Sequence, residues 1–166
     1  NSALNTYLTC INASDRDLEY FINELRNIGR PVVLVFFGDH QPSAATTLND
    51  ELYPQEDTAS HAFRIHQSTY FVWANYEIAG NTELNVYDTV GANEIAAITL
   101  NKIGAPLTDY QKALLATRSD VPTINVAGYL GADGLRYDLE SEDSPYASTI
   151  DKLQRMQYLE FASKVQ

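Results

Sequence analysis

An unbroken apolar run, VVLVFF at residues 32–37, constrains the fold more than any other feature of the chain. It follows Pro31 and is rich in β-branched and aromatic residues, which favours a strand. A strand with one face in water would alternate polar and apolar residues. The run therefore predicts a strand buried on both faces, in a mostly parallel sheet flanked by helices.

Helical and strand-like segments alternate around this run, which is typical of an α/β domain. Before it, Ser14 is predicted to cap a helix that ends near Gly29. The apolar stripe of that helix consists of Leu18, Phe21, Ile22 and Leu25. After the run, residues 41–67 are polar and show no period, which predicts a long loop with at most a short helix. Residues 70–74 (YFVWA) predict a second buried strand.

The second half of the chain has clearer start and stop signals. Thr108 and Gln111 have the spacing of a capping box, and the Asp133-Gly134 pair is a strong signal for a hairpin turn. The predicted elements are a helix over residues 93–103, a helix from the capping box onward, a strand over residues 121–127, a small hairpin turning at residues 133–134, and a last helix from Ser144.

Composition limits the partners of the chain. Its 166 residues include 22 acidic and 11 basic side chains, for a net charge of −11 and a pI near 4.5. Nucleic acid is excluded as a partner, because phosphate binding needs a basic surface. At 45% hydrophobic residues, the chain is expected to form a single domain over residues 1–166. No apolar run reaches the roughly 18 residues of a spanning helix, so a membrane anchor would lie outside this sequence.

Asp39 and His40 come directly after the predicted buried strand, where α/β sheets place their ligands. A carboxylate and an imidazole are metal ligands, and the nitrogen favours Mn²⁺ or Zn²⁺ over Mg²⁺. Gly38 permits the backbone break that would let both side chains reach one ion. The alternative is that Asp39 caps a turn and His40 is an ordinary loop residue.

Three further residues are candidates for a role at the same site. His61 and His66 could each be a third metal ligand, a phosphate donor or a general acid/base, or they could be surface histidines. Arg64 could pair with an anionic substrate, or lie exposed without one. No nucleophile elbow, phosphate-binding glycine loop or calcium loop is present in the sequence.

The order of motifs along the chain resembles the carboxyl-terminal part of the lipoteichoic acid synthase-like sulfatases. These are membrane-anchored phosphoglycerol transferases of the alkaline phosphatase superfamily. FFGDHQP at residues 36–42 is the most specific piece. The segments that support it are GRPVVLV at residues 29–35, TYFVWANYEI at residues 69–78, IGAPLTDYQKALL at residues 103–115, PTINVAGYLGADGLRY at residues 122–137 and RMQYLEF at residues 155–161.

The resemblance implies a site and a reaction. In this family the Asp-His pair after the strand binds the catalytic divalent metal, usually manganese, which places two ligands at Asp39 and His40. The nucleophilic threonine, a further acidic ligand and the substrate-binding histidine and arginine of the family lie upstream of the matching region. The expected fold is therefore the C-terminal portion of an alkaline phosphatase/sulfatase-like domain that is inactive alone. His66 and Arg64 remain candidates for substrate binding.

The implied reaction transfers phosphoglycerol from phosphatidylglycerol, or another anionic phospholipid headgroup, at the extracytoplasmic face of the bacterial membrane. Sulfate ester hydrolysis or phosphoethanolamine transfer on the same fold is one alternative, and a non-catalytic binding domain is another. A sheet without its remaining strands would expose an edge and apolar surface, so self-association of the chain is expected.

Overall fold

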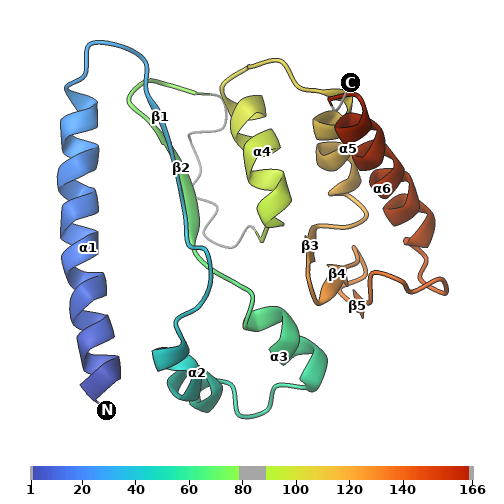
Figure 1. Cartoon of the computed structure of the whole chain (residues 1–166), viewed down its shortest axis with the longest axis horizontal. Coiled ribbons are helices and arrows are strands. Elements are labelled where there is room, and N and C mark those ends of the chain that lie inside the picture. The colour runs from blue at the N-terminus through green and yellow to red at the C-terminus, as the bar shows by residue number, and fades with distance from the viewer. Residues whose placement is uncertain (1, 79–88, 165–166) are drawn as a thin grey trace. The chain divides into compact units, whose positions relative to one another are not determined.

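The structure is a computed structural model that describes residues 2–78 and 89–164. Its contacts divide the chain into two compact units, Asn1–Glu77 and Ile78–Gln166. Both units mix helices with a small antiparallel sheet (Figure 1). This mixture confirms the predicted α/β class, but a parallel pairing is not seen among the described strands. None of the described helices combines the length and apolar character needed to cross a bilayer.

The first unit is built from one long helix, a two-stranded ribbon and two short helices. Its elements are α1 (Ser2–Arg26), β1 (Val33–Phe37), the 3-10 helix η1 (Ser43–Ala45), α2 (Thr46–Leu52), α3 (Thr58–Arg64) and β2 (Tyr70–Ala74). Figure 1 shows α2 and α3 at the end of the ribbon where β1 finishes and β2 starts. The chain between the strands therefore returns to the end that it left.

Helix α1 begins at Ser2, so the prediction of an N-cap at Ser14 was wrong. Leu8 and Ile11 extend the apolar stripe toward the N-terminus, and neither glycine nor proline interrupts the first 26 residues. The other end of the helix is held by Asn75, whose Nδ2 lies 3.2 Å from the Leu25 carbonyl oxygen. One amide side chain thus fixes the end of α1 to the end of β2.

Strands β1 and β2 pair antiparallel, from Val33 opposite Ala74 to Phe37 opposite Tyr70. The predicted parallel arrangement is therefore wrong for this pair. A parallel neighbour needs a crossover to the opposite end of the sheet, whereas residues 38–69 fold at one end. The apolar run is also less buried than predicted, since the Phe37 side chain is 59% exposed.

Residues 41–67 contain two helices and a 3-10 turn, instead of the predicted loop with at most one short helix. The start of α3 does carry a local signal, because the Asp57 carboxylate accepts a 2.7 Å hydrogen bond from the Ser60 amide. The helices themselves are too short for a recognisable apolar period, and tertiary contacts hold them in place.

The second unit follows the sequence predictions closely. Its elements are η2 (Ala92–Glu94), α4 (Ile95–Lys102), α5 (Asp109–Thr117), β3 (Thr123–Asn125), β4 (Gly128–Leu130), β5 (Arg136–Tyr137) and α6 (Ala147–Ala162). Thr108 and Gln111 form the predicted capping box at the start of α5. The predicted hairpin is present between β4 and β5, where Gly134 takes a φ of +79°.

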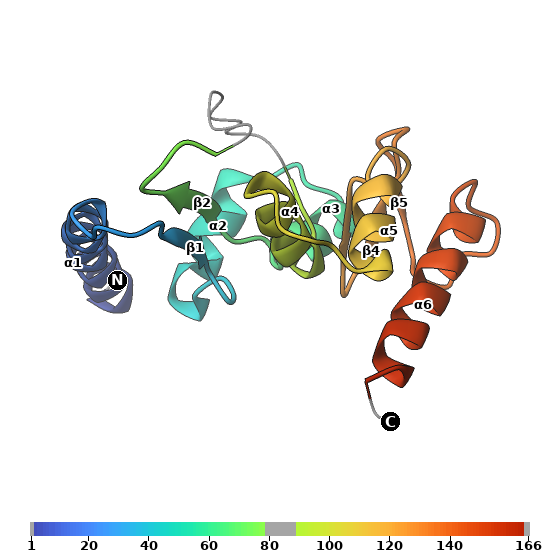
Figure 2. The same ribbon diagram turned by 90° about the horizontal axis from the view of Figure 1, so that it is seen from above.

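The core of the second unit lies where the small sheet meets the last helix. Val121, Tyr129 and Ile150 are buried together, and Leu114 of α5 is also buried. Helices α5 and α6 lie side by side (Figures 1 and 2). This arrangement makes the second unit a compact helical layer with a hairpin at one end, and it contains none of the predicted site residues.

Candidate functional site

The loop that carries Asp39 and His40 begins where the ribbon ends. The Gly38 amide donates to the Thr69 carbonyl at 3.0 Å, and the Ser68 hydroxyl donates to the Gly38 carbonyl at 2.6 Å. A Cβ atom at Gly38 would lie only 3.0 Å from the Ser68 Cβ. Gly38 therefore allows the two strands to stay close up to the last residue before the pair.

Asp39 and His40 place two electron-pair donors next to each other. His40 Nδ1 lies 2.9 Å from the Gln41 carbonyl oxygen. Because a carbonyl only accepts, Nδ1 must carry the ring proton, which leaves a lone pair on Nε2. Nε2 is 3.5 Å from Asp39 Oδ2. The two atoms therefore face a common space, as two ligands of one cation would.

Both side chains are open to solvent, with Asp39 86% and His40 75% exposed. The other carboxylate oxygen, Asp39 Oδ1, accepts a 2.9 Å hydrogen bond from the His40 amide. That bond holds the carboxylate against its own loop and leaves Oδ2 toward the imidazole. A carboxylate oxygen beside an imidazole nitrogen suits a divalent transition-metal ion.

The pair supplies two ligands at most. Within residues 2–78 and 89–164, no three histidine, cysteine or acidic side chains are grouped to hold a metal ion. The residues present therefore fit a divalent cation as part of its coordination shell, with the remaining positions open to water or to groups from elsewhere.

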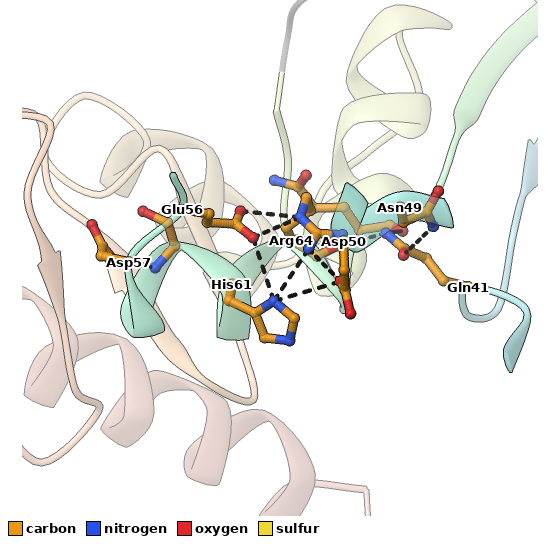
Figure 3. Close-up of polar contacts among 9 residues, drawn as sticks. Gln41, Asn49, Asp50, Glu56, Asp57, His61 and Arg64 are labelled. Atoms are coloured by element: carbon orange, nitrogen blue, oxygen red, sulfur yellow. Dashed lines mark hydrogen bonds and ion pairs between the residues drawn. The ribbon is translucent and has the colours of Figure 1, made fainter. Parts of the chain in front are cut away.

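Arg64 pairs with two carboxylates of its own chain, and its role in substrate binding stays a prediction. Its Nε is 2.8 Å from Glu56 Oε2 and its Nη2 is 2.8 Å from Asp50 Oδ1 (Figure 3). The hydrogen bond to Asp50 and the one to Glu56 raise the pKa of Arg64 above its usual value. The guanidinium also lies over the Tyr53 ring, 4.8 Å from its centre. These contacts give Arg64 a structural role between α2 and α3.

His61 belongs to the same network. Its Nδ1 is 3.1 Å from Arg64 Nη2, 3.4 Å from Glu56 Oε2 and 3.7 Å from Asp50 Oδ1 (Figure 3). Since the guanidinium only donates, Nδ1 of His61 accepts from Arg64. Because the lone pair of Nδ1 accepts from Arg64, this nitrogen is not available to a metal ion in this arrangement.

His66 is exposed and follows α3. Its backbone amide donates to the Phe63 carbonyl at 3.2 Å. The segment that carries it is connected to the loop of the pair, because Gln41 Nε2 donates to the Gln67 carbonyl at 3.0 Å. His66 remains a prediction as a substrate-binding residue, and it lies in the same segment between β1 and β2 as Asp39 and His40.

Sequence reasoning missed Gln41 and Ser68, the two side chains that connect this loop to its surroundings. Ser68 bonds to Gly38, and Gln41 bonds to the chain around α3. Neither residue has a distinctive type or spacing. The only signal available from sequence was the position of Gln41 directly after the Asp-His pair.

The segment that carries β1 and the Asp-His pair lies in a region that matches a known protein family. The model of the family described as Sulfatase matches residues 1–97, which is more than half of the chain. The chain therefore belongs to the sulfatase family. This finding confirms the family that the sequence motifs indicated. No curated protein sequence matches the chain.

A solved structure extends the comparison to the second unit. The chain is similar to the Streptococcus pyogenes phosphoglycerol transferase GacH, solved in complex with sn-glycerol-1-phosphate, with a TM-score of 0.57 and 21% identity. The match covers 87% of this chain and 31% of the solved chain. It shows a shared fold over both units. The chain thus spans about a third of the length of that solved chain.

Proposed function

We propose that this chain is the C-terminal part of a metal-dependent phosphoglycerol transferase, in which Asp39 and His40 bind a catalytic divalent cation. The observation that carries the proposal is the 3.5 Å approach of His40 Nε2 to Asp39 Oδ2 at the carboxyl end of β1. Its location inside the segment matched by the sulfatase family supports the same assignment.

Mn²⁺ is the metal we propose, with Zn²⁺ and Mg²⁺ as alternatives, because an imidazole ligand favours transition metals. A cation bound there stabilises negative charge on phosphate oxygens as a Lewis acid. Two residues of this chain would hold that cation: Asp39 through Oδ2, and His40 through Nε2, with its proton kept on Nδ1 by the Gln41 carbonyl.

The donor we propose is phosphatidylglycerol or another anionic lipid headgroup, at the extracytoplasmic face of a bacterial membrane. The likeness to GacH, a phosphoglycerol transferase solved with sn-glycerol-1-phosphate, supports a phosphoglycerol group. We further propose that the nucleophile comes from a part of the domain outside this sequence, so that the chain alone turns over no substrate.

The experiment that tests the metal site is a titration with Mn²⁺ followed by NMR. Paramagnetic ions broaden signals near their binding site, so weak binding is measurable. We expect broadening centred on residues 38–41, and its loss in Asp39→Ala and His40→Ala. Uniform broadening over the surface, or broadening unchanged by both substitutions, would contradict the proposal.

A matched control uses His66→Ala, which removes another exposed imidazole from the segment between β1 and β2. If His66 contacts substrate and not metal, the Mn²⁺ affinity of this variant equals that of the wild type. A loss of affinity would instead make His66 a third ligand, as the sequence allowed.

Because the matching family is described as Sulfatase, sulfate ester hydrolysis is a second candidate function. The two are separated by adding sn-glycerol-1-phosphate, or a sulfate monoester of similar size, to the chain loaded with Zn²⁺, which is diamagnetic and leaves signals near the site visible. A phosphoglycerol transferase is expected to show shifts around residues 38–41 and 66 with the phosphate only. Equal or stronger shifts with the sulfate would favour a sulfatase.

A further inference from the structure

The side chain of Gln41 makes hydrogen bonds to three different segments. Its Nε2 donates to the Arg64 carbonyl at 2.6 Å and to the Gln67 carbonyl at 3.0 Å, and its Oε1 accepts from Asn49 Nδ2 at 3.1 Å. Because carbonyls only accept, the amide orientation is fixed, with nitrogen toward α3 and oxygen toward α2 (Figure 3). Both amide hydrogens and the amide oxygen are thus engaged.

These bonds anchor the residue whose backbone orients His40. The Gln41 carbonyl accepts from His40 Nδ1 at 2.9 Å, and this contact puts the ring proton on Nδ1 and the lone pair on Nε2. Residues that orient a histidine ligand in this way set both its tautomer and its direction. The carbonyl can do so only if residue 41 is held still.

The anchor is itself supported by charged side chains. The Arg64 carbonyl that accepts from Gln41 belongs to the residue clamped between Asp50 and Glu56. Arg64 and Glu56 have side chains that are only 10% and 12% exposed. Breaking an ion pair that is this little exposed carries a large free-energy cost. Arg64 therefore gives the loop a rigid attachment point.

We propose that Gln41 is a positioning residue for the metal site: its side chain fixes the loop so that its own carbonyl presents His40 Nε2 toward Asp39. The proposal rests on the function proposed above for Asp39 and His40. It adds that α2 and α3, through Asn49 and Arg64, determine the geometry of the pair without contacting the cation.

The test replaces Gln41 with methionine, which has similar length and no charge but cannot make the three bonds. We expect Mn²⁺ affinity, measured by the NMR titration, to fall about tenfold in Gln41→Met. Gln67→Met is the matched control, because residue 67 contributes its backbone carbonyl and keeps it after substitution. An unchanged affinity in Gln41→Met would overturn the proposal.

A second readout does not depend on metal. The nitrogen shifts of the His40 ring at mildly alkaline pH report which nitrogen carries the proton. We expect the Nδ1–H tautomer in the wild type and in Gln67→Met, and a mixture in Gln41→Met. If the wild type binds no Mn²⁺ but Gln41→Met still changes the His40 tautomer, the proposed function fails. The positioning role of Gln41 then stands. The same tautomer in all three proteins would overturn the positioning role.

Gln41→Met could also loosen α2 and α3, so the amide spectrum of residues 46–64 is recorded for each variant. If that region unfolds, Asn49→Ala decides the question, because it removes only the bond to Gln41 Oε1. We expect a two- to threefold loss of Mn²⁺ affinity, on the order of a single lost hydrogen bond. No loss in that variant would overturn the proposal.

Discussion

The hydroxyl of Tyr137 donates a 2.7 Å hydrogen bond to Asp133 Oδ2 across the turn of the β4–β5 hairpin. This bond, with the one from the Leu135 amide, lowers the pKa of Asp133. It also raises the pKa of Tyr137 to about 12. The pair thus couples the stability of the hairpin to pH at both ends of the scale.

The sign of that coupling differs between the two groups. Tyr137 has a raised pKa, so its contribution to stability is complete below its ordinary value of 10.0 and is lost as pH rises toward 12. Asp133 has a lowered pKa, so its contribution is present above 3.8 and is lost as pH falls through the lowered value. We expect Tyr137→Phe, which keeps the ring, to flatten both changes.

The measurement is urea unfolding at a series of pH values, followed through the ring signals of Tyr129, which is buried beside Tyr137. The wild type should lose stability between pH 10 and 12 by more than Tyr137→Phe does. Parallel curves for the two proteins over that range would show that the hydrogen bond does not affect stability.

The second unit also depends on Glu94, whose side chain is 2% exposed. Its Oε2 accepts from the Gly91 amide at 2.7 Å and from Arg118 at 2.6 Å. Glu94→Ala would leave both donors without this acceptor, and we expect it to cost about 3–5 kcal/mol of unfolding free energy. Glu142→Ala, at an exposed position, should change stability by less than about 0.5 kcal/mol. Urea unfolding measures the free energy of unfolding of both variants. Equal losses would contradict a stabilising role for the buried Glu94 side chain.

A pair of glycine substitutions tests the close approach at the start of the loop that carries Asp39 and His40. Gly38→Ala would bring a Cβ within 3.0 Å of the Ser68 Cβ, so we expect a loss of about 1–2 kcal/mol. Gly29→Ala is the control, because no atom lies within 4 Å of its added Cβ. It should be neutral or stabilising by up to about 1 kcal/mol.

Fluorescence of Trp73 in β2 reports unfolding of the unit that contains both glycines. The prediction is contradicted if Gly38→Ala and Gly29→Ala unfold at the same urea concentration.

The apolar stripe of α1 predicts self-association of the chain. Leu8 and Ile11 are 50% and 48% exposed, whereas Leu25 at the other end of the stripe is buried. We expect sedimentation velocity to show species larger than a monomer as concentration rises. Leu8→Glu combined with Ile11→Glu should restore a monomer. Leu135→Glu, at an exposed position in the hairpin turn, is the control. A monomer at every concentration would exclude self-association.

The second unit could be predicted element by element, because its signals are local. A capping box at Thr108 and Gln111 and an Asp133-Gly134 turn specify their structures through bonds within a few residues. Residues 41–67 carry weaker local signals. Their helices depend on the ion pairs of Arg64 with Glu56 and Asp50, which lie 8 and 14 positions before it in the sequence.

By itself, the sequence determined the strand at residues 33–37, the position of Asp39 and His40 at its end, and the family to which the chain belongs. Only the tertiary structure decided that β2 pairs antiparallel with that strand, and that Gln41 connects its loop to α2 and α3. Apolar patterning records which residues avoid water, but not the direction of a neighbouring strand. The partners of a polar side chain are set by the path of the chain between them.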